Sequence, residues 1–186
     1  MGLSFFVGNQ FGYNLAKLST LGSGRVDAAW RPNPSYAVTA LALRGDGLFV
    51  GGWFDSIGGA FRTNLAMISA EGTGAADSAW QANVVSDPYN YGGYPAYSVV
   101  ALALHGNNLF VGGNFTNIGG FSRNNLARVT ATGVGEVARV WQENANASVS
   151  ALIAVGNEIY AGGGFTNIRG VARYGLANLP AADPAR

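Results

Sequence analysis

Short apolar runs separated by glycine-rich turns recur along the chain. Residues 48–54 (LFVGGWF) have close copies at 109–115 (LFVGGNF) and 159–165 (IYAGGGF), so the copies lie 61 and 50 residues apart. A second run, at 38–43 (VTALAL), recurs at 99–104 and 149–154. Short β-branched and aromatic runs bounded by Gly, Asn and Asp predict β-strands. Self-similarity at a period of roughly 50 residues predicts a repeat architecture.

Each repeat unit contains four predicted strands, here called segments a to d. Segment a is the 38–43 type of run, and segment b is the run with the Gly-Gly pair. Segment c covers 64–70 and its copies at 14–20, 125–131 and 175–180, and segment d contains Trp30, Trp80 or Trp141. The links between a and b, such as Arg44-Gly45-Asp46-Gly47, suit tight hairpin turns. Four consecutive antiparallel strands predict one blade of an all-β propeller.

The repeat units are about 1–37, 38–98, 99–148 and 149–186, within a single β-propeller domain or half-propeller. If residues 5–8 are segment b of the first unit, the chain has about four blade-equivalents and fourteen strands. The first blade then lacks segment a, and the last blade lacks segment d. Such a chain can close as a narrow ring, pair with a second copy as two half-rings, or belong to a longer propeller. Self-association is favoured because it hides unpaired strand edges.

Composition excludes several classes of function. Charged residues make up 11% of the chain, against roughly 25% in ordinary domains. A net charge of +1 without a basic stripe argues against nucleic-acid binding. The absence of cysteine excludes disulfides, thiol catalysis and cysteine-ligated zinc. No apolar run is long enough for a membrane helix, and residues 1–14 lack the features of a signal peptide, so neither membrane insertion nor a leader is expected in this chain.

The combination of ALAL (40–43), a Gly-Asp turn, LFVGG (48–52) and Arg62-x-Asn64-Leu65-Ala66 resembles the delta-60 repeats of bacterial β-propellers. The Gly-Gly pair is also weakly similar to kelch repeats. The resemblance covers nearly the whole chain and implies a propeller fold in a large exported or surface protein. It therefore implies an extracellular, cell-surface or periplasmic location. The function of that family is mostly unknown, so the resemblance supplies no active site.

The clearest departure from the repeat is a long link between segments d and a. Trp80 and Val99 are 19 residues apart, whereas the equivalent links take eight. Tyrosine offers rigid amphipathic area, and Asp and Asn offer adaptable polar contacts, which suits a carbohydrate or peptide. The predicted ligand-binding residues are Asp87, Tyr89, Asn90, Tyr91, Tyr94 and Tyr97, together with Trp53. The alternatives are a loop packed on its own blade or at a subunit seam, and for Trp53 packing between blades.

Two sets of residues recur in register and are predicted to be structural. Trp30, Trp80 and Trp141 are expected in the core. Arg62, Arg123 and Arg173 are expected to hold carbonyl groups of the b–c links, because a guanidinium offers five donors in a fixed fork. A ring of anion sites is the alternative for the arginines. Arg44-Gly45-Asp46 spells a cell-attachment triplet, but its Gly-Asp pair is explained by turn chemistry.

Few residues are available for catalysis. His105 is the sole histidine and is placed near a hairpin turn, and only Asp55 and Asp87 are candidates for a carboxylate pair. No catalytic residue, metal ligand or cofactor is predicted. The expected function is therefore a non-catalytic structural or protein-interaction module. The alternatives are a glycan-binding module and, third, a glycoside-processing enzyme. The expected partners are a second copy or neighbouring blades, with a glycan or peptide as a further possibility.

Overall fold

The computed structural model describes residues 4–7, 10–20, 24–85 and 98–182. These residues form strands and no helix, so none of them belongs to a helix that could cross a membrane. The strands are β1 (Ser4–Val7), β2 (Gln10–Tyr13), β3 (Val38–Arg44), β4 (Gly47–Gly52), β5 (Ser56–Ile57), β6 (Ala60–Phe61), β7 (Leu65–Ser69), β8 (Val84–Val85), β9 (Val99–His105), β10 (Asn108–Gly113), β11 (Asn117–Ile118), β12 (Phe121–Ser122), β13 (Leu126–Thr130), β14 (Val149–Val155), β15 (Glu158–Gly163), β16 (Asn167–Ile168), β17 (Val171–Ala172) and β18 (Leu176–Pro180).

Three antiparallel sheets of the same design follow one another along the chain. Sheet I has the strand order β3-β4-β7, sheet II β9-β10-β13, and sheet III β14-β15-β18. In each sheet the Gly-Gly strand is central, and its pairing register with the other two strands is repeated. The turns between segments a and b contain Gly45, Gly106 and Gly156 at φ of 54°, 57° and 56°. The predicted all-β class and the a–b hairpins are confirmed.

The predicted count of fourteen strands in four-stranded blades is wrong. The described residues form eighteen strands: nine in the three sheets, six in the two-residue hairpins β5–β6, β11–β12 and β16–β17, and the strands β1, β2 and β8. Segment d is a single bridge to segment c, at Ile68–Ala76 and Val129–Val137. Asp77 explains the early end of segment d in sheet I. Its carboxylate accepts hydrogen bonds from Ala79 N and Trp80 N, each at 2.8 Å, and turns the chain away.

The assignment of residues 5–8 to segment b is also wrong. β1 pairs with β2 in a hairpin that corresponds to β5–β6, because Val7 precedes Asn14 by the same seven residues that separate Ile57 from Asn64. Asn14 and Asn64 share a left-handed backbone, with φ of 57° and 63°. Among the described residues, the first unit therefore has the b–c hairpin and segments c and d, without a counterpart of β3 or β4.

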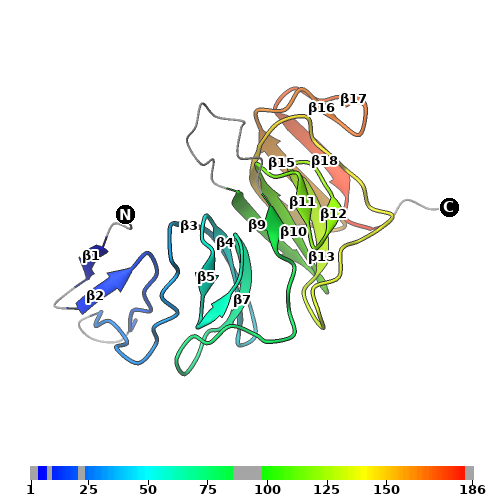
Figure 1. The fold of residues 1–186 in the computed structure, drawn as a ribbon. Helices are drawn as coiled ribbons and strands as arrows, with labels where there is room; N and C mark the ends of the chain where they lie inside the picture. Colours follow the sequence, from blue (N-terminus) through cyan, green and yellow to red (C-terminus); the bar gives the residue numbers. More distant parts are fainter. Residues whose placement is uncertain (1–3, 8–9, 21–23, 86–97, 183–186) are drawn as a thin grey trace.

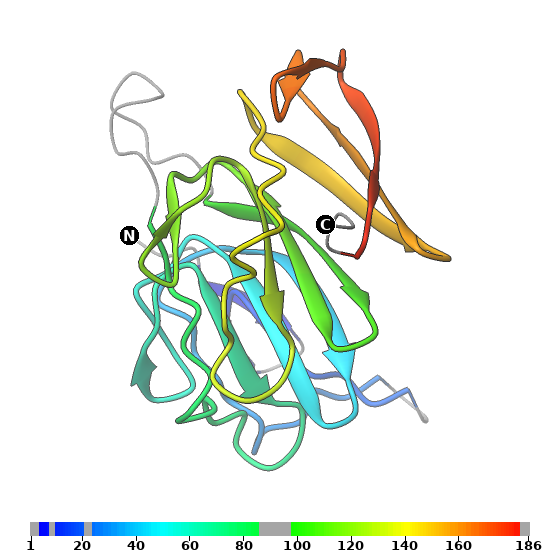
Figure 2. The ribbon, with the colours of Figure 1, turned by 90° about the vertical axis from the view of Figure 1, so that its right-hand side faces the viewer.

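The sheets lie side by side in chain order, with the β1–β2 hairpin at one end and sheet III at the other (Figures 1 and 2). β3, β9 and β14 are neighbours across the sheet junctions. Buried side chains fill each junction: Phe49, Trp80, Leu109 and Val111 between sheets I and II, and Phe110, Trp141, Ile159 and Ala161 between sheets II and III. A third cluster, with Trp30, Val50, Phe54 and Ala66, covers the face of sheet I that points toward the N-terminal unit.

Candidate functional site

The two-residue hairpins and the d–a links meet at one end of the sheets, here called the hairpin face. Val85, the last described residue before the long link, pairs with Asn117. In sheet I the hydroxyl of Ser35 accepts hydrogen bonds from Asp55 N and Ser56 N at 2.9 and 3.2 Å. At sheet III, Asn146 Oδ1 accepts from Thr166 N and Asn167 N, both at 2.9 Å. Each d–a link thus packs on the hairpin of the following unit.

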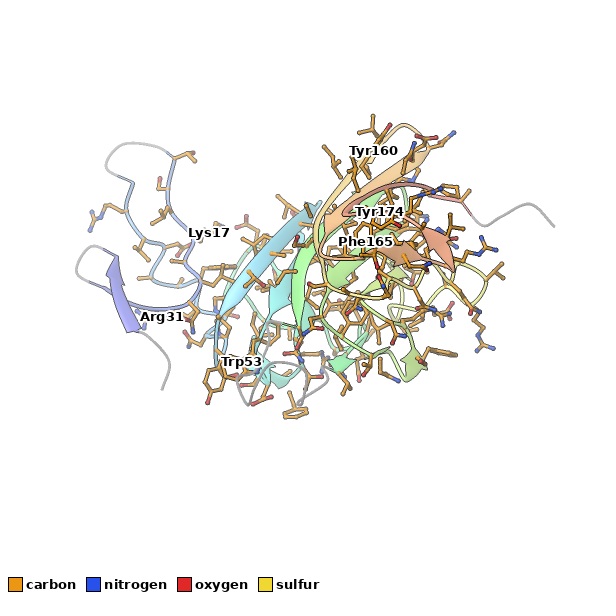
Figure 3. All side chains as sticks on the ribbon, turned by 90° about the horizontal axis from the view of Figure 1, so that it is seen from above. Lys17, Arg31, Trp53, Tyr160, Phe165 and Tyr174 are labelled. Carbon is orange, nitrogen blue, oxygen red and sulfur yellow. The ribbon has the colours of Figure 1, made fainter. Side chains whose placement is uncertain are left out.

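The predicted ligand-binding residues of the long link fall outside the described residues. These are Asp87, Tyr89, Asn90, Tyr91, Tyr94 and Tyr97. Trp53 is described and stacks on Tyr36, with ring centroids 4.6 Å apart and an interplanar angle of 27°. Both rings are partly buried, and Figure 3 shows Trp53 at the edge of the molecule. Sequence reasoning missed Tyr36, although it occupies the same repeat position as Tyr97.

The recurring arginines bind backbone carbonyls of the hairpins. Arg62 Nη1 donates to Phe61 O at 2.9 Å and its Nη2 donates to Asp77 O at 2.7 Å. Arg123 makes the equivalent bonds to Ser122 O and Ala138 O at 2.7 and 2.8 Å. Burial lowers the pKa of the Arg123 guanidinium. Arg173 is exposed and donates to Ala172 O at 3.1 Å. Arg62 and Arg123 therefore tie the hairpin to segment d.

The recurring tryptophans lie in the sheet junctions. Trp30, Trp80 and Trp141 are 5%, 0% and 0% exposed. Each indole N–H donates to the last residue of strand β7, β13 or β18 in the next sheet: Ser69 O at 2.9 Å, Thr130 O at 2.9 Å and Pro180 O at 2.8 Å. These side chains therefore join consecutive units.

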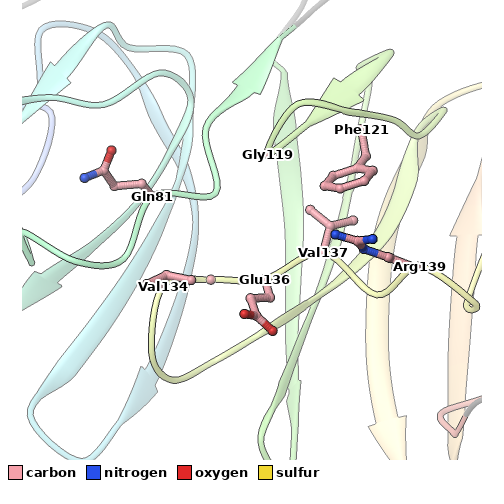
Figure 4. Close-up of a pocket in the computed structure, with 8 residues that line it drawn as sticks. Gln81, Gly119, Phe121, Val134, Glu136, Val137 and Arg139 are labelled. Atoms are coloured by element: carbon pink, nitrogen blue, oxygen red, sulfur yellow. The ribbon is translucent and has the colours of Figure 1, made fainter.

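An open groove of about 550 Å³ lies beside β11 and β12 (Figure 4). Phe121, Val137, Gln81 and the oppositely charged Glu136 and Arg139 contribute to its lining. The Arg139 guanidinium lies 5.3 Å from the Phe121 ring centroid. A similar groove in the preceding unit is lined by Arg31 and Ala60, the repeat counterparts of Gln81 and Phe121. The two grooves therefore share two equivalent lining positions, while Val137, Glu136 and Arg139 line the first groove alone.

Titratable residues are scattered in the described part of the chain. It contains no group of three or more His, Cys, Asp and Glu side chains suited to a metal ion. Asp55 is exposed on the hairpin face, whereas its possible partner Asp87 is outside the described residues. His105 is the last residue of β9. Arg44 of the Arg-Gly-Asp triplet donates to Asn107 Oδ1 at 2.6 Å and Ala131 O at 3.3 Å, so it joins sheet I to sheet II.

The outer face of sheet III is the most distinctive surface among the described residues. Ile153, Val155, Tyr160 and Leu176 project from this face and are 58%, 53%, 38% and 67% exposed. At the repeat positions of Tyr160 and Leu176, sheets I and II have Phe49, Phe110, Leu65 and Leu126, all 0% exposed. Sequence reasoning missed this surface, because the apolar pattern of β14 and β15 matches that of the covered strands.

Comparison with known proteins gives no relative for this chain: no protein family, no curated protein and no solved structure matches it.

Proposed function

We propose that the chain is a non-catalytic, propeller-type interaction module of an exported or surface bacterial protein, and that it assembles through the outer face of sheet III. The repeated antiparallel sheets, with β3, β9 and β14 as neighbours, support a propeller, whose innermost strands surround a common axis. The resemblance to delta-60 repeats supports the same architecture and the exported setting.

The observation that carries the proposal is the concentration of apolar side chains on that face. Single exposed apolar residues are normal on proteins, whereas a contiguous group marks an interaction surface. Ile153 lies directly opposite Tyr160 in the β14–β15 pairing, and Val155 and Leu176 lie on the same side of the sheet. Covering each large apolar side chain fully would contribute about 1.5–3 kcal/mol.

Light scattering over a dilution series tests this proposal. The wild type is expected to exceed its 19.2 kDa chain mass at high concentration and to approach it on dilution. Ile153→Lys replaces an apolar side chain of this face with a charged one that the contact would bury, and it should weaken assembly roughly tenfold or more. Val171→Lys is the control, because Val171 is 49% exposed on the hairpin β16–β17. Equal assembly of Ile153→Lys and wild type would contradict the proposal, as would a wild type that stays at the chain mass.

A second candidate function is glycan binding at the hairpin face, which the stacked pair Tyr36 and Trp53 favours. Planar aromatic side chains supply rigid contact area for a sugar ring. A glycan array should then show binding by the wild type that is lost in Trp53→Ala and in Tyr89→Ala/Tyr91→Ala. Binding that is unaffected by these substitutions, or no binding by the wild type, would contradict this function.

A further inference from the structure

The two internal sheet junctions share a close contact between glycine and valine. A Cβ atom added to Gly112 of β10 would lie 2.9 Å from Val149 Cγ1 at the start of β14. A Cβ on Gly51 of β4 would collide with Val99 Cγ1 at the start of β9. In both junctions, glycine on the central strand of one sheet leaves the space that valine of the next sheet occupies.

Each junction also contains an aromatic pair with edge-on geometry. Trp80 and Phe49 have ring centroids 5.2 Å apart at 66°, and Trp141 and Phe110 have centroids 5.1 Å apart at 77°. Every internal junction therefore combines glycine and phenylalanine on the rear of one sheet with valine and tryptophan on the front of the next. Here the front is the face toward the N-terminal unit, and the rear is the opposite face.

The rear of sheet III contains the first half of this arrangement without the second. Gly162 holds the repeat position of Gly51 and Gly112, but a Cβ on Gly162 would meet only Ala151 Cβ at 3.5 Å and Gly175 O at 3.9 Å. Tyr160 replaces the buried phenylalanine and is 38% exposed. Within the described residues, no valine and no tryptophan covers this pair.

The front of sheet I contains the other half. Val38 and Trp30 hold the repeat positions of Val99 and Trp80, and both contribute to the front cluster. Beside them on β3, Leu41 and Leu43 are 50% and 61% exposed. Their counterparts Leu102 and Leu104 pack against the core between sheets I and II. Figure 3 shows Tyr160 at the end of the molecule opposite Lys17 and Arg31, so the two halves cannot meet within one chain.

We propose that two copies of the chain associate head to tail, with the rear of sheet III in one copy seated on the front of sheet I in the other. This inference rests on the proposed function and names its partner as a second copy. Val38 enters the space at Gly162, the edge of Trp30 meets the Tyr160 ring, and Ile153 and Val155 cover Leu41 and Leu43. Such a contact joins two different surfaces. The resulting pair still has one free front of sheet I and one free rear of sheet III, so further copies can bind at either end.

A hydroxyl group on β14 is placed for a hydrogen bond across this contact. In sheet I, Thr39 Oγ1 donates to Val99 O of sheet II and also approaches Gly51 O at 3.3 Å. Ser150 holds the repeat position of Thr39, is exposed, and makes the equivalent contact with Gly162 O at 3.4 Å. Its hydroxyl is therefore available to Val38 O of the second copy.

Docking requires residues 14–19 of the second copy to move. They lie on the front of sheet I, where Leu15 packs against the front cluster and Lys17 Nζ donates to Ala70 O at 3.0 Å. If sheet III of one copy packed on the front of sheet I of the other, as consecutive sheets of one chain do, β18 would occupy the place of residues 14–19. Residues 14–19 are held by the isolated bridge Leu18–Val26, by the packing of Leu15 and by the hydrogen bonds of Lys17, and these contacts are given up when a second copy docks.

Sedimentation equilibrium of Gly162→Ala tests the docking mode. Because a Cβ at Gly162 has room in the single chain, the variant should keep the wild-type melting temperature. Overpacking against Val38 should nevertheless weaken association by roughly tenfold. Gly164→Ala is the matched control, since a Cβ at that exposed glycine meets nothing within 4 Å. If the wild type associates and Gly162→Ala associates equally, head-to-tail docking is overturned while the proposed function stands. A wild type that never associates overturns both.

A mixing experiment distinguishes head-to-tail from rear-to-rear contact. Leu41→Glu/Leu43→Glu blocks the front of sheet I and leaves sheet III intact, and Gly162→Ala blocks the rear of sheet III. Each variant alone should associate at least about tenfold more weakly than the wild type, and an equimolar mixture should form a complex of one chain of each kind with nearly the wild-type affinity. A front-blocked variant that associates with itself as strongly as the wild type would overturn the head-to-tail mode.

Discussion

Two adjacent glycines on each central strand meet different neighbours. Gly51 and Gly112 leave space for a valine of the next sheet. The second glycine of each pair faces the end of the d–a link that leads into its sheet, and a Cβ on Gly113 would collide with Ser98 O. Gly52 and Gly163 are equally close to Ala37 O and Ser148 O. The Gly-Gly signature is therefore required by two close approaches of the chain, one to the link that leads into the sheet and one to the next sheet.

This difference predicts unequal effects of the same substitution at three repeat positions. Gly51→Ala and Gly112→Ala should each lower the free energy of unfolding by about 1–3 kcal/mol, because the added methyl group overpacks a filled junction. Gly162→Ala should change it by less than about 1 kcal/mol, since alanine also restricts the unfolded chain. Urea denaturation at a concentration where the wild type is monomeric measures all three. Equal losses at Gly112 and Gly162 would show that the junction contact does not limit the glycine.

At the level of elements, each sheet is joined to the next by a tryptophan that lies outside the strands. Trp80 follows segment d of sheet I, packs on Phe49 and donates to Thr130 O of sheet II, 50 residues away. Gly135 leaves room for this ring, because a Cβ there would lie 2.9 Å from Trp80 Cε2. Consecutive sheets therefore share one core residue and one backbone hydrogen bond, which couples their unfolding.

Trp80→Phe is expected to lower the free energy of unfolding by about 1–3 kcal/mol, because the carbonyl of Thr130 loses its indole donor in a buried site. Trp53→Phe is the control, since Trp53 is partly buried and phenylalanine retains a ring to stack on Tyr36. Chemical denaturation followed by circular dichroism gives both values. A smaller loss for Trp80→Phe than for Trp53→Phe would contradict the proposed coupling.

The sequence predicts the repeated strands better than it predicts their ends. The a–b hairpins and the buried tryptophans follow from apolar runs and turn residues that recur in register. Segment d reads as a strand, but Asp77 turns the chain after one bridge. The strands of the b–c hairpins have two residues each, which is too short to show the alternation of apolar and polar residues typical of a strand. Residues 5–8 resemble segment b in composition, and only their distance from Asn14 separates them from it. The exposure of the apolar side chains on the rear of sheet III depends on whether another sheet covers them. The sequence pattern of β14 and β15 does not contain that information.

At the scale of the whole molecule, association depends on the two outer surfaces, the front of sheet I and the rear of sheet III. The front of sheet I is half covered by residues 14–19, and Lys17 secures them through Ala70 O and an ion pair with Glu71 at 2.8 Å. The rear of sheet III has no such cover among the described residues. Association is therefore an exchange, in which a second copy replaces residues 14–19 on one end and covers apolar surface on the other.

Lys17→Ala should tighten association by roughly twofold to fivefold, because it removes an exposed ion pair that holds the competing segment. Sedimentation velocity across a concentration series measures the change, and Lys17→Arg should behave like the wild type because it retains the charge. Weaker association of Lys17→Ala would mean that residues 14–19 support the contact instead of competing with it.

The most direct measurement of the central claim, that the rear of sheet III is an assembly surface, is the weight-average mass of the wild type by sedimentation equilibrium at increasing concentration. Association through this surface predicts a mass that rises above 19.2 kDa with concentration and returns to it on dilution. A mass that stays at 19.2 kDa throughout would contradict it.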